Sequence, residues 1–235
     1  MNILVVVAHP DDEILGCGGT IATYTRLGNS VNVIFLTSGV TSRFPIGDSR
    51  AMSKLEEIRK HAVLANRVLG IGEENLHFFG FEDQALDTVP ISTIIDRIRN
   101  VIIDMDVHMV LTHHWGDYNK DHRIAYEATL YATRCSPLEN SPGELLTFEV
   151  LSSTERSFGS LGPFIPNTYM NISETIELKI SAMSEYKSEL HDFPHPRSLI
   201  GIRNLASVRG SEVGLAEVEA FHLVRAIRNF PHNEN

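Results

Sequence analysis

Residues 3–13 read ILVVVAHPDDE, in which six aliphatic residues are followed at once by a polar turn. An unbroken aliphatic run is typical of a strand that is buried on both faces, as central strands of parallel sheets are. Residues 20–27 predict a short helix that ends at Gly28, and residues 31–37 (VNVIFLT) predict a second buried strand. The three elements form a β-α-β unit, which almost always crosses over right-handed into a parallel sheet.

Strand and helix patterns continue to alternate along the chain. Helices are predicted at 49–69, 92–104 and 124–134, and strands at 76–79 and 107–112. This alternation is typical of an α/β protein. We therefore expect a three-layer sandwich with a mostly parallel, Rossmann-like central sheet.

The second part of the chain is less regular than the first. Its predicted elements are strands at 145–151 and 220–226, a helix that begins near Ser173, and a helix at 198–208. The sequence shows no repeat and no flexible linker before this part. We expect a single domain over residues 1–235, with a Rossmann-like half (1–135) and a C-terminal portion (136–235) that completes the site.

The composition is that of an ordinary globular protein. Hydrophobic residues make up 43% and charged residues 21% of the 235 residues, which excludes disordered and fibrous classes. The 30 acidic residues outnumber the 20 basic ones, and the resulting net charge of -10 argues against nucleic acid or an anionic membrane as the main partner.

Cysteine usage and the N-terminus predict a cytoplasmic protein. Cys17 and Cys135 lie far apart and outside any CxxC pattern, which excludes a disulfide framework and a cysteine-rich zinc site. The start lacks the basic segment and long apolar stretch of a signal peptide, and no apolar run reaches the roughly 20 residues of a membrane span. We expect no membrane insertion, and a homo-oligomer is compatible with the sequence.

The turn after the first strand carries His9, Asp11, Asp12 and Glu13. Open α/β sheets bind their ligands at the carboxyl ends of strands, where this turn is expected to lie. Imidazole and carboxylate suit zinc, and a second carboxylate that stays off the metal could deprotonate a metal-bound water. The alternative is a solvated turn whose aspartates cap the start of a helix, which is a common use of Asp.

A second polar cluster, HHWGDYNKDH at residues 113–122, follows the predicted strand at 107–112. It falls on the same edge of the sheet as the first cluster. A catalytic zinc needs three protein ligands and an open position for water. His9, Asp12 and one histidine of the second cluster would provide these ligands.

Four segments of the chain resemble the LmbE-like, or PIG-L, family of zinc-dependent N-deacetylases. They are AHPDDEILGCGG (8–19), DYNKDHR (117–123), FPHPRS (193–198) and AEVEAF (216–221), and the resemblance covers nearly the whole chain. Members of this family deacetylate N-acetylglucosaminyl conjugates. The resemblance implies a metal-dependent hydrolase that removes the acetyl group from an N-acetylated amino sugar or its conjugate, a small-molecule partner. It implies one Zn²⁺ per chain, although this ligand set also suits other divalent ions such as Fe²⁺.

The resemblance also assigns roles to individual residues. It makes His9, Asp12 and His122 the metal ligands, and Asp11 the general base that activates the zinc water. Asp121 resembles the family's orienting carboxylate, whose partner is a nearby catalytic imidazole.

Asn119 departs from the pattern of many relatives, which carry a histidine at this position. An amide can still donate a hydrogen bond to an oxyanion, but it cannot deliver a proton to the leaving amine. The candidates for this proton are His195, His113 and His114, or Asp11 acting first as base and then as acid. We favour His195, because prolines on both sides hold its backbone in place.

Three further side chains are expected to contact substrate. Arg197 could clamp a phosphate or carboxylate through its planar fork, Trp115 could stack on a sugar ring, and His113 could point into the site. Asp83, Arg43 and Arg50 are assigned to ordinary surface charge. The glycines at 16–19 are expected to let a helix approach the sheet near the metal, and Cys17 to be a small buried residue.

Other functions remain alternatives at this point. One is an amidase that acts on a larger acyl group or a thiol conjugate. Another is a metal- and sugar-binding protein whose turnover is impaired by Asn119. A Rossmann nucleotide-binding domain is disfavoured, because no GxGxxG follows Ala8.

Overall fold

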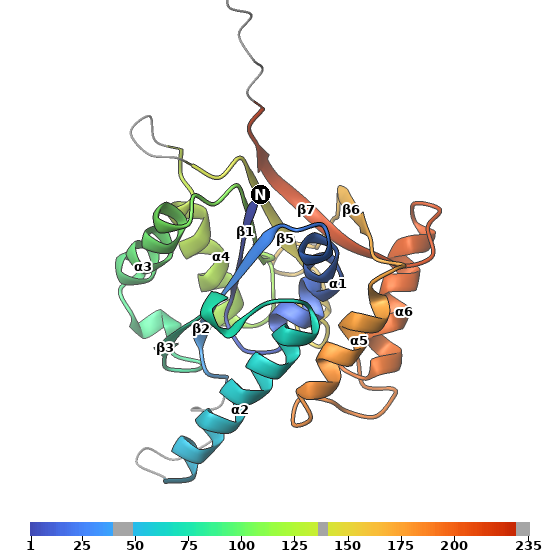
Figure 1. Ribbon diagram of the computed structural model, residues 1–235, viewed down its shortest axis with the longest axis horizontal. Coiled ribbons are helices and arrows are strands. Elements are labelled where there is room, and N and C mark those ends of the chain that lie inside the picture. The colour runs from blue at the N-terminus through green and yellow to red at the C-terminus, as the bar shows by residue number, and fades with distance from the viewer. Residues whose placement is uncertain (40–48, 136–140, 229–235) are drawn as a thin grey trace, which may run out of the picture.

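One seven-stranded sheet forms the centre of the computed structural model, which describes residues 1–39, 49–135 and 141–228 (Figure 1). The strands are β1 (Asn2–Val7), β2 (Ser30–Thr37), β3 (Leu76–Phe81), β4 (Met109–His113), β5 (Glu144–Phe148), β6 (Thr168–Asn171) and β7 (Val218–Ala226). Their order is β3-β2-β1-β4-β5-β7-β6, with β1 to β5 parallel and β7 antiparallel to both of its neighbours. The α/β class and the mostly parallel, Rossmann-like sheet are confirmed.

Helices cover both faces of this sheet. They are α1 (Asp12–Arg26), α2 (Ser49–Val68), α3 (Ile91–Asp104), α4 (Lys120–Ala132), α5 (Ile176–Glu185) and α6 (Leu199–Ser211). Successive side chains of a strand point to opposite faces, so Val5 and Val7 of β1 pack toward α1 and α2, whereas Leu4 and Val6 pack toward α3 and α4. Figure 1 shows α3 and α4 on one side of the sheet, opposite α1, α2, α5 and α6.

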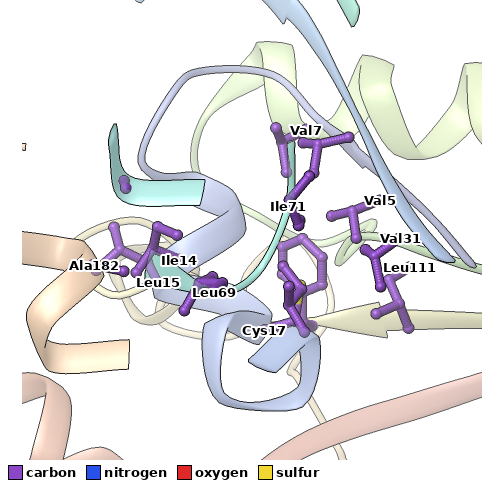
Figure 2. Packing of buried hydrophobic residues seen from close by; sticks show 14 of the residues in the cluster. Val5, Val7, Ile14, Leu15, Cys17, Val31, Leu69, Ile71, Leu111 and Ala182 are labelled. Carbon is purple, nitrogen blue, oxygen red and sulfur yellow. The ribbon is translucent and has the colours of Figure 1, made fainter. Parts of the chain in front are cut away.

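The larger core lies between the sheet and α1. Figure 2 shows Val5, Val7 and Leu111 of the sheet on one side and Ile14 and Leu15 of α1 on the other. All are at least 98% buried, and burial of each such side chain contributes roughly 1.5–3 kcal/mol. This packing fixes the start of α1 against the carboxyl end of β1.

The helix predicted for residues 20–27 begins earlier, at Asp12. The glycines that suggest a loop lie inside α1 because the helix passes very close to the sheet. A Cβ atom on Gly16 would lie 2.2 Å from the ring of Phe148. The expectation of close approach to the sheet is confirmed at Gly16, whereas the expected start of the helix is wrong.

The helix α1 is broken at Cys17 (φ −148°), and a buried ion pair contacts its backbone at this break. Glu219 of β7 accepts a hydrogen bond from the N–H group of Gly19 at 2.9 Å, and Lys179 of α5 donates to the carbonyl of Leu15 at 2.9 Å. Lys179 also donates to Glu219 at 2.5 Å. The pair therefore provides hydrogen-bond partners for backbone groups on both sides of the break. In a continuous helix, these groups would bond to other backbone groups of the same helix.

Other boundaries also differ from the predictions. The helix predicted at 124–134 begins at Lys120, because the side chain of Asn119 caps it. The helix expected near Ser173 begins at Ile176, and β6 was not predicted, since only four residues form it. Among the residues that the structure describes, no helix is long and apolar enough to cross a membrane.

Candidate metal centre and active site

The two polar clusters meet because β1 and β4 are parallel neighbours. His9 and Asp12 follow the carboxyl end of β1, and His122 lies in the first turn of α4, which follows β4. The side chains of these three residues are between 3% and 12% exposed. The fold thus brings together residues that lie 113 positions apart in the chain.

Three potential ligand atoms form a nearly equilateral triangle. Nδ1 of His9 lies 3.2 Å from Oδ2 of Asp12 and 3.2 Å from Nε2 of His122, and the last two atoms are 3.3 Å apart. Metal–ligand bonds of about 2.1 Å place neighbouring ligand atoms roughly 3.0 Å apart in octahedral and roughly 3.4 Å apart in tetrahedral coordination. The spacing of the triangle therefore fits a divalent cation.

The outward nitrogen of each imidazole faces a carboxylate. Nε2 of His9 lies 3.1 Å from Oδ1 of Asp83 and 3.5 Å from Oδ2 of Asp121, and Nδ1 of His122 lies 3.2 Å from Oδ1 of Asp117. Such partners fix the tautomer and the orientation of metal-binding histidines. His9, Asp83 and Asp121 also lie close enough to form a second candidate ligand group, which uses the other nitrogen of His9.

The site strongly favours positive charge. Burial lowers the pKa of His122, but Asp12 and Asp117 outweigh burial and raise it to about 9. Burial likewise lowers the pKa of His9, and hydrogen bonds with Asp12 and Asp121 outweigh burial and raise it well above its usual value. A bound divalent cation would supply this positive charge in place of the protons, which the imidazoles release on binding it.

Asp117 contacts the candidate ligand His122, and the sequence analysis gave it no role. Its carboxylate is fully buried and accepts hydrogen bonds from Ser153 Oγ at 2.5 Å, Thr154 Oγ1 at 2.6 Å and the N–H group of Asn119 at 2.8 Å. Burial raises the pKa of Asp117, but His122 and these hydrogen bonds outweigh it and hold the pKa at about 2. The carboxylate beside His122 is therefore held both ionised and in place.

Asp83 was assigned to surface charge, and that assignment is wrong. It is 5% exposed and lies against His9. Asp121 accepts hydrogen bonds from the N–H groups of Gln84 at 2.8 Å and Leu86 at 3.3 Å, so it fixes the loop that carries Asp83. Its imidazole partner is His9, a candidate metal ligand, and not a separate catalytic histidine.

The other two charges assigned with Asp83 lie elsewhere. Arg50 is exposed on α2, as the sequence analysis expected. Arg43 lies outside the described residues.

Asp11 adopts a left-handed backbone conformation, with φ 113°, at the N-cap of α1. The carboxylate of Asp11 is not part of the metal triangle, to which the neighbouring Asp12 contributes. Oδ2 of Asp11 accepts a hydrogen bond from Nη1 of Arg197 at 2.9 Å. Burial and the charge of Asp12 raise the pKa of Asp11 well above its usual value, although Arg197 opposes the shift.

Arg197 lies between two carboxylates. Besides Asp11, its Nη1 lies 3.4 Å from Oε2 of Glu189, which is 5% exposed. Arg197 lines the cavity as expected, but its charge is already balanced from two sides. The role predicted for it, as a clamp for a phosphate or carboxylate of the substrate, finds no support in this pairing.

Glu13 connects the start of α1 to two other helices. It is fully buried, and it accepts hydrogen bonds from Tyr186 Oη at 2.6 Å, Asn66 Nδ2 at 2.9 Å and the N–H group of Asp11 at 3.0 Å. Burial raises the pKa of Glu13 to about 7, against the effect of these hydrogen bonds. The sequence analysis gave Glu13 no separate role.

A cavity of about 180 Å³ opens over the metal triangle. Its charged and polar walls include the side chains of His9, Asp11, Asp12, Ser38, Asp83, Gln84, Asn119, His122, Ser152, Ser153, Glu189 and Arg197. Asn119 uses its Oδ1 to accept the N–H group of Asp121 at 2.9 Å, which leaves its Nδ2 as the end that can donate. The amide can thus act as the predicted hydrogen-bond donor.

His195, the predicted acid, is not among the described residues that line this cavity. Its ring lies 4.1 Å from that of His191, and its Nδ1 accepts a hydrogen bond from the N–H group of Arg197 at 3.1 Å. The turn around His195 therefore places Arg197 in the cavity, whereas the imidazole of His195 faces His191.

His113, His114 and Trp115 also lie outside the described lining of the cavity. His113 is fully buried under the ring of His122, 3.9 Å away, and its Nε2 accepts the N–H group of Ala8 at 2.9 Å. Burial holds the pKa of His113 at about 3. The predicted substrate contact of His113 is therefore corrected to a supporting position behind a candidate ligand.

Trp115 packs away from the cavity. Its ring lies 5.8 Å from that of Tyr126 and 4.9 Å from that of His222. The neighbouring His114 has its Nε2 atom 3.0 Å from the carbonyl oxygen of Gly162. The predicted stacking of Trp115 on a sugar ring is not supported, because protein rings occupy its surroundings.

Residues 4–133 match the protein family described as PIG-L: GlcNAc-PI de-N-acetylase. The chain is also similar to a probable N-acetyl-alpha-D-glucosaminyl L-malate deacetylase 2 from Bacillus cereus. The two are 27% identical over 191 residues, which cover 80% of this chain and 83% of that protein.

Solved structures show the same fold. The chain is similar to N,N'-diacetylchitobiose deacetylase from Pyrococcus horikoshii, with a TM-score of 0.78 and 20% identity over 95% of this chain and 84% of that chain. It is also similar to 4-carboxy-2-hydroxymuconate hydratase from Pseudomonas putida, with a TM-score of 0.76 and 20% identity over 98% and 99% of the two chains. One fold therefore serves two reactions, and the reaction must be argued from the site.

Proposed function

The chain belongs to the PIG-L family, and we propose that it removes the acetyl group from an N-acetylated amino sugar or its conjugate with the help of a divalent metal ion. The observation that carries this proposal is the metal triangle of His9, Asp12 and His122 with the carboxylate of Asp11 beside it in one cavity. A metal site and an unligated carboxylate together supply the Lewis acid and the general base of metal-assisted amide hydrolysis.

Zinc is the proposed metal. The donor set of two imidazoles and one carboxylate is common at catalytic zinc sites, and it also suits other divalent ions such as Fe²⁺. When bound, such an ion supplies Lewis acidity and lowers the pKa of a coordinated water.

Asp11 is the proposed base. Arg197 holds its Oδ2, so Oδ1 is the oxygen that takes a proton from the attacking water. The proton must then reach the nitrogen of the leaving amine. Because the structure places His195 outside the cavity lining, we favour Asp11 as the acid of this second step as well.

Asn119 is the proposed stabiliser of the negative charge that develops on the amide oxygen. Its Oδ1 is held by the N–H group of Asp121, which fixes the direction of the Nδ2 group. A donor that is oriented before the reaction stabilises such charge without a cost of reorganisation.

The substrate class rests on relatives. Two of those described above are deacetylases, one of an N-acetylglucosaminyl malate and one of diacetylchitobiose. The cavity of about 180 Å³ has room for about six waters, which suits an acetamido group and part of one sugar ring.

Acetate release joined to metal analysis tests the proposal. Purified protein is assayed with N-acetylglucosamine and N,N'-diacetylchitobiose before and after chelation, and again after zinc is restored. We expect acetate release that requires the metal and is at least about a hundredfold slower in Asp11→Asn. Sugar binding with a bound metal but no acetate release would instead support the catalytically impaired binding protein. Faster release of longer acyl groups, in a series of N-acyl glucosamines, would support the amidase.

A further inference from the structure

We propose that Glu13 is a positioning residue that holds Asp11 in the conformation needed for its role as base. The inference rests on the proposed function. It concerns a carboxylate that belongs neither to the described lining of the cavity nor to the metal triangle.

Adjacent aspartates with different tasks need an unusual backbone. Asp12 contributes an oxygen to the metal triangle, whereas Asp11 presents its carboxylate to Arg197 and the cavity. The chain separates the two by giving Asp11 a φ of 113°. Residues other than glycine rarely adopt positive φ, and such strain persists only where the surroundings hold it.

Glu13 supplies a contact that holds this conformation. Its Oε2 accepts the N–H group of Asp11 at 3.0 Å. The same N–H group belongs to the residue whose backbone is strained, so the hydrogen bond acts directly on the turn. The start of α1 is a site where a carboxylate is also favoured by the helix dipole.

The rest of Glu13 is anchored from outside α1. Oε1 accepts hydrogen bonds from Tyr186 Oη at 2.6 Å and from Asn66 Nδ2 at 2.9 Å. Tyr186, which follows α5, is fully buried, and Asn66 lies in α2. These three partners all donate, and the carboxylate oxygens of Glu13 accept from them.

This donor pattern provides a selective substitution. In Glu13→Gln, the oxygen can remain with Tyr186 and Asn66, and the amide nitrogen then faces the N–H group of Asp11. Two donors cannot form a hydrogen bond, so the variant loses the contact to Asp11 with almost no change in volume.

The expected effect is a loss in kcat. A misplacement of about 1 Å in a reacting group costs about a hundredfold in rate, so Glu13→Gln should reduce kcat by about 10- to 100-fold. KM should change by less than about threefold, and the metal content should stay at the wild-type level. Tyr186→Phe is the matched control, because Asn66 still holds Oε1 and the contact to Asp11 is untouched. We expect this control to lower the melting temperature and leave kcat within about threefold.

A double-mutant cycle with Asp11→Asn separates positioning from a general structural effect. If Glu13 acts through Asp11, then Glu13→Gln lowers kcat in the wild-type background and has little effect in the Asp11→Asn background. Equal losses in both backgrounds, or equal losses in Glu13→Gln and Tyr186→Phe, would overturn the inference. Acetate release by the wild type and its loss in Asp11→Asn test the proposed function independently, so the two failures are distinguishable.

Discussion

Arg197 and Asp11 stand 186 positions apart in the chain, and a hydrogen bond of 2.9 Å joins Nη1 of Arg197 to Oδ2 of Asp11. The C-terminal portion thus supplies the cation that faces the base on the first turn of the chain. The same Nη1 also lies near Glu189. The arginine therefore lines the proposed active site and is paired there with two carboxylates.

Replacing Arg197 with lysine should impair the chemical step. A lysine keeps the charge but is shorter and lacks the planar guanidinium group that holds Nη1 between Asp11 and Glu189. We expect kcat to fall by about 10- to 100-fold, with metal content unchanged, as measured by steady-state kinetics and elemental analysis. Wild-type kcat in this variant would show that charge alone is sufficient.

Substitution of Asp11 should remove turnover, whereas substitution of Asp12 should remove the metal. Asp11→Asn should keep the metal and lose at least about a hundredfold in turnover, the usual scale for removal of a general base. Asp12→Asn should lose metal, since its oxygen belongs to the triangle. Elemental analysis of both variants is the measurement, and the reverse pattern would mean that their roles are exchanged.

Asp117 should control metal affinity from outside the ligand set. Its carboxylate orients His122, and loss of such a partner typically costs about 10- to 100-fold in metal affinity. We expect this loss in Asp117→Asn, measured by competition with a chelator. The control is Asp87→Asn, because Asp87 pairs with Lys120 on the surface. Equal affinities in the two variants would contradict the assignment.

Alanine substitutions of His195 and Asn119 should have different effects on turnover. His195→Ala should retain turnover within about threefold, because the ring lies against His191 and not in the described cavity lining. Asn119→Ala should lose about a hundredfold or more, the scale seen on removal of an oxyanion donor. A severe, metal-independent loss in His195→Ala would restore His195 as the acid.

Lys179 should be required for stability more than for chemistry. Lys179→Met leaves the buried carboxylate of Glu219 without its cation, and breaking a buried pair in this way costs about 3–5 kcal/mol. Chemical denaturation measures the loss. Lys54→Met is the control, because the pair of Lys54 with Glu57 is exposed and worth about 0–1 kcal/mol. Similar losses in both variants would show that burial does not matter here.

The sequence predicts the fold and the metal triangle well because their signals are local. The aliphatic run of β1 and the polar turn behind it are contiguous, and a second strand followed by His122 repeats the pattern. Parallel neighbours then bring the two turns together without further information. The cytoplasmic location and the homo-oligomer stay predictions.

What the sequence does not reveal depends on contacts between distant segments. Asp83 has no motif around it, and its burial follows from the approach of its loop to His9. The role of Asp117 depends on Ser153 and Thr154, which come from the loop after β5. The direction of His195 is set by a turn whose neighbours cannot be known in advance.

The break in α1 bears on the order in which parts of the chain can fold during synthesis. The ribosome makes the turn of Asp11 and Asp12 before it adds Glu219, which lies 200 positions after its partner Gly19. Until then, the N–H groups of Gly19 and Thr20 have no carboxylate to accept them. A growing chain can assemble the first strands early, but the helix behind Asp11 and Asp12 is completed only when β7 docks. The helix behind the proposed base is therefore completed only by a strand that lies 200 positions further along the chain.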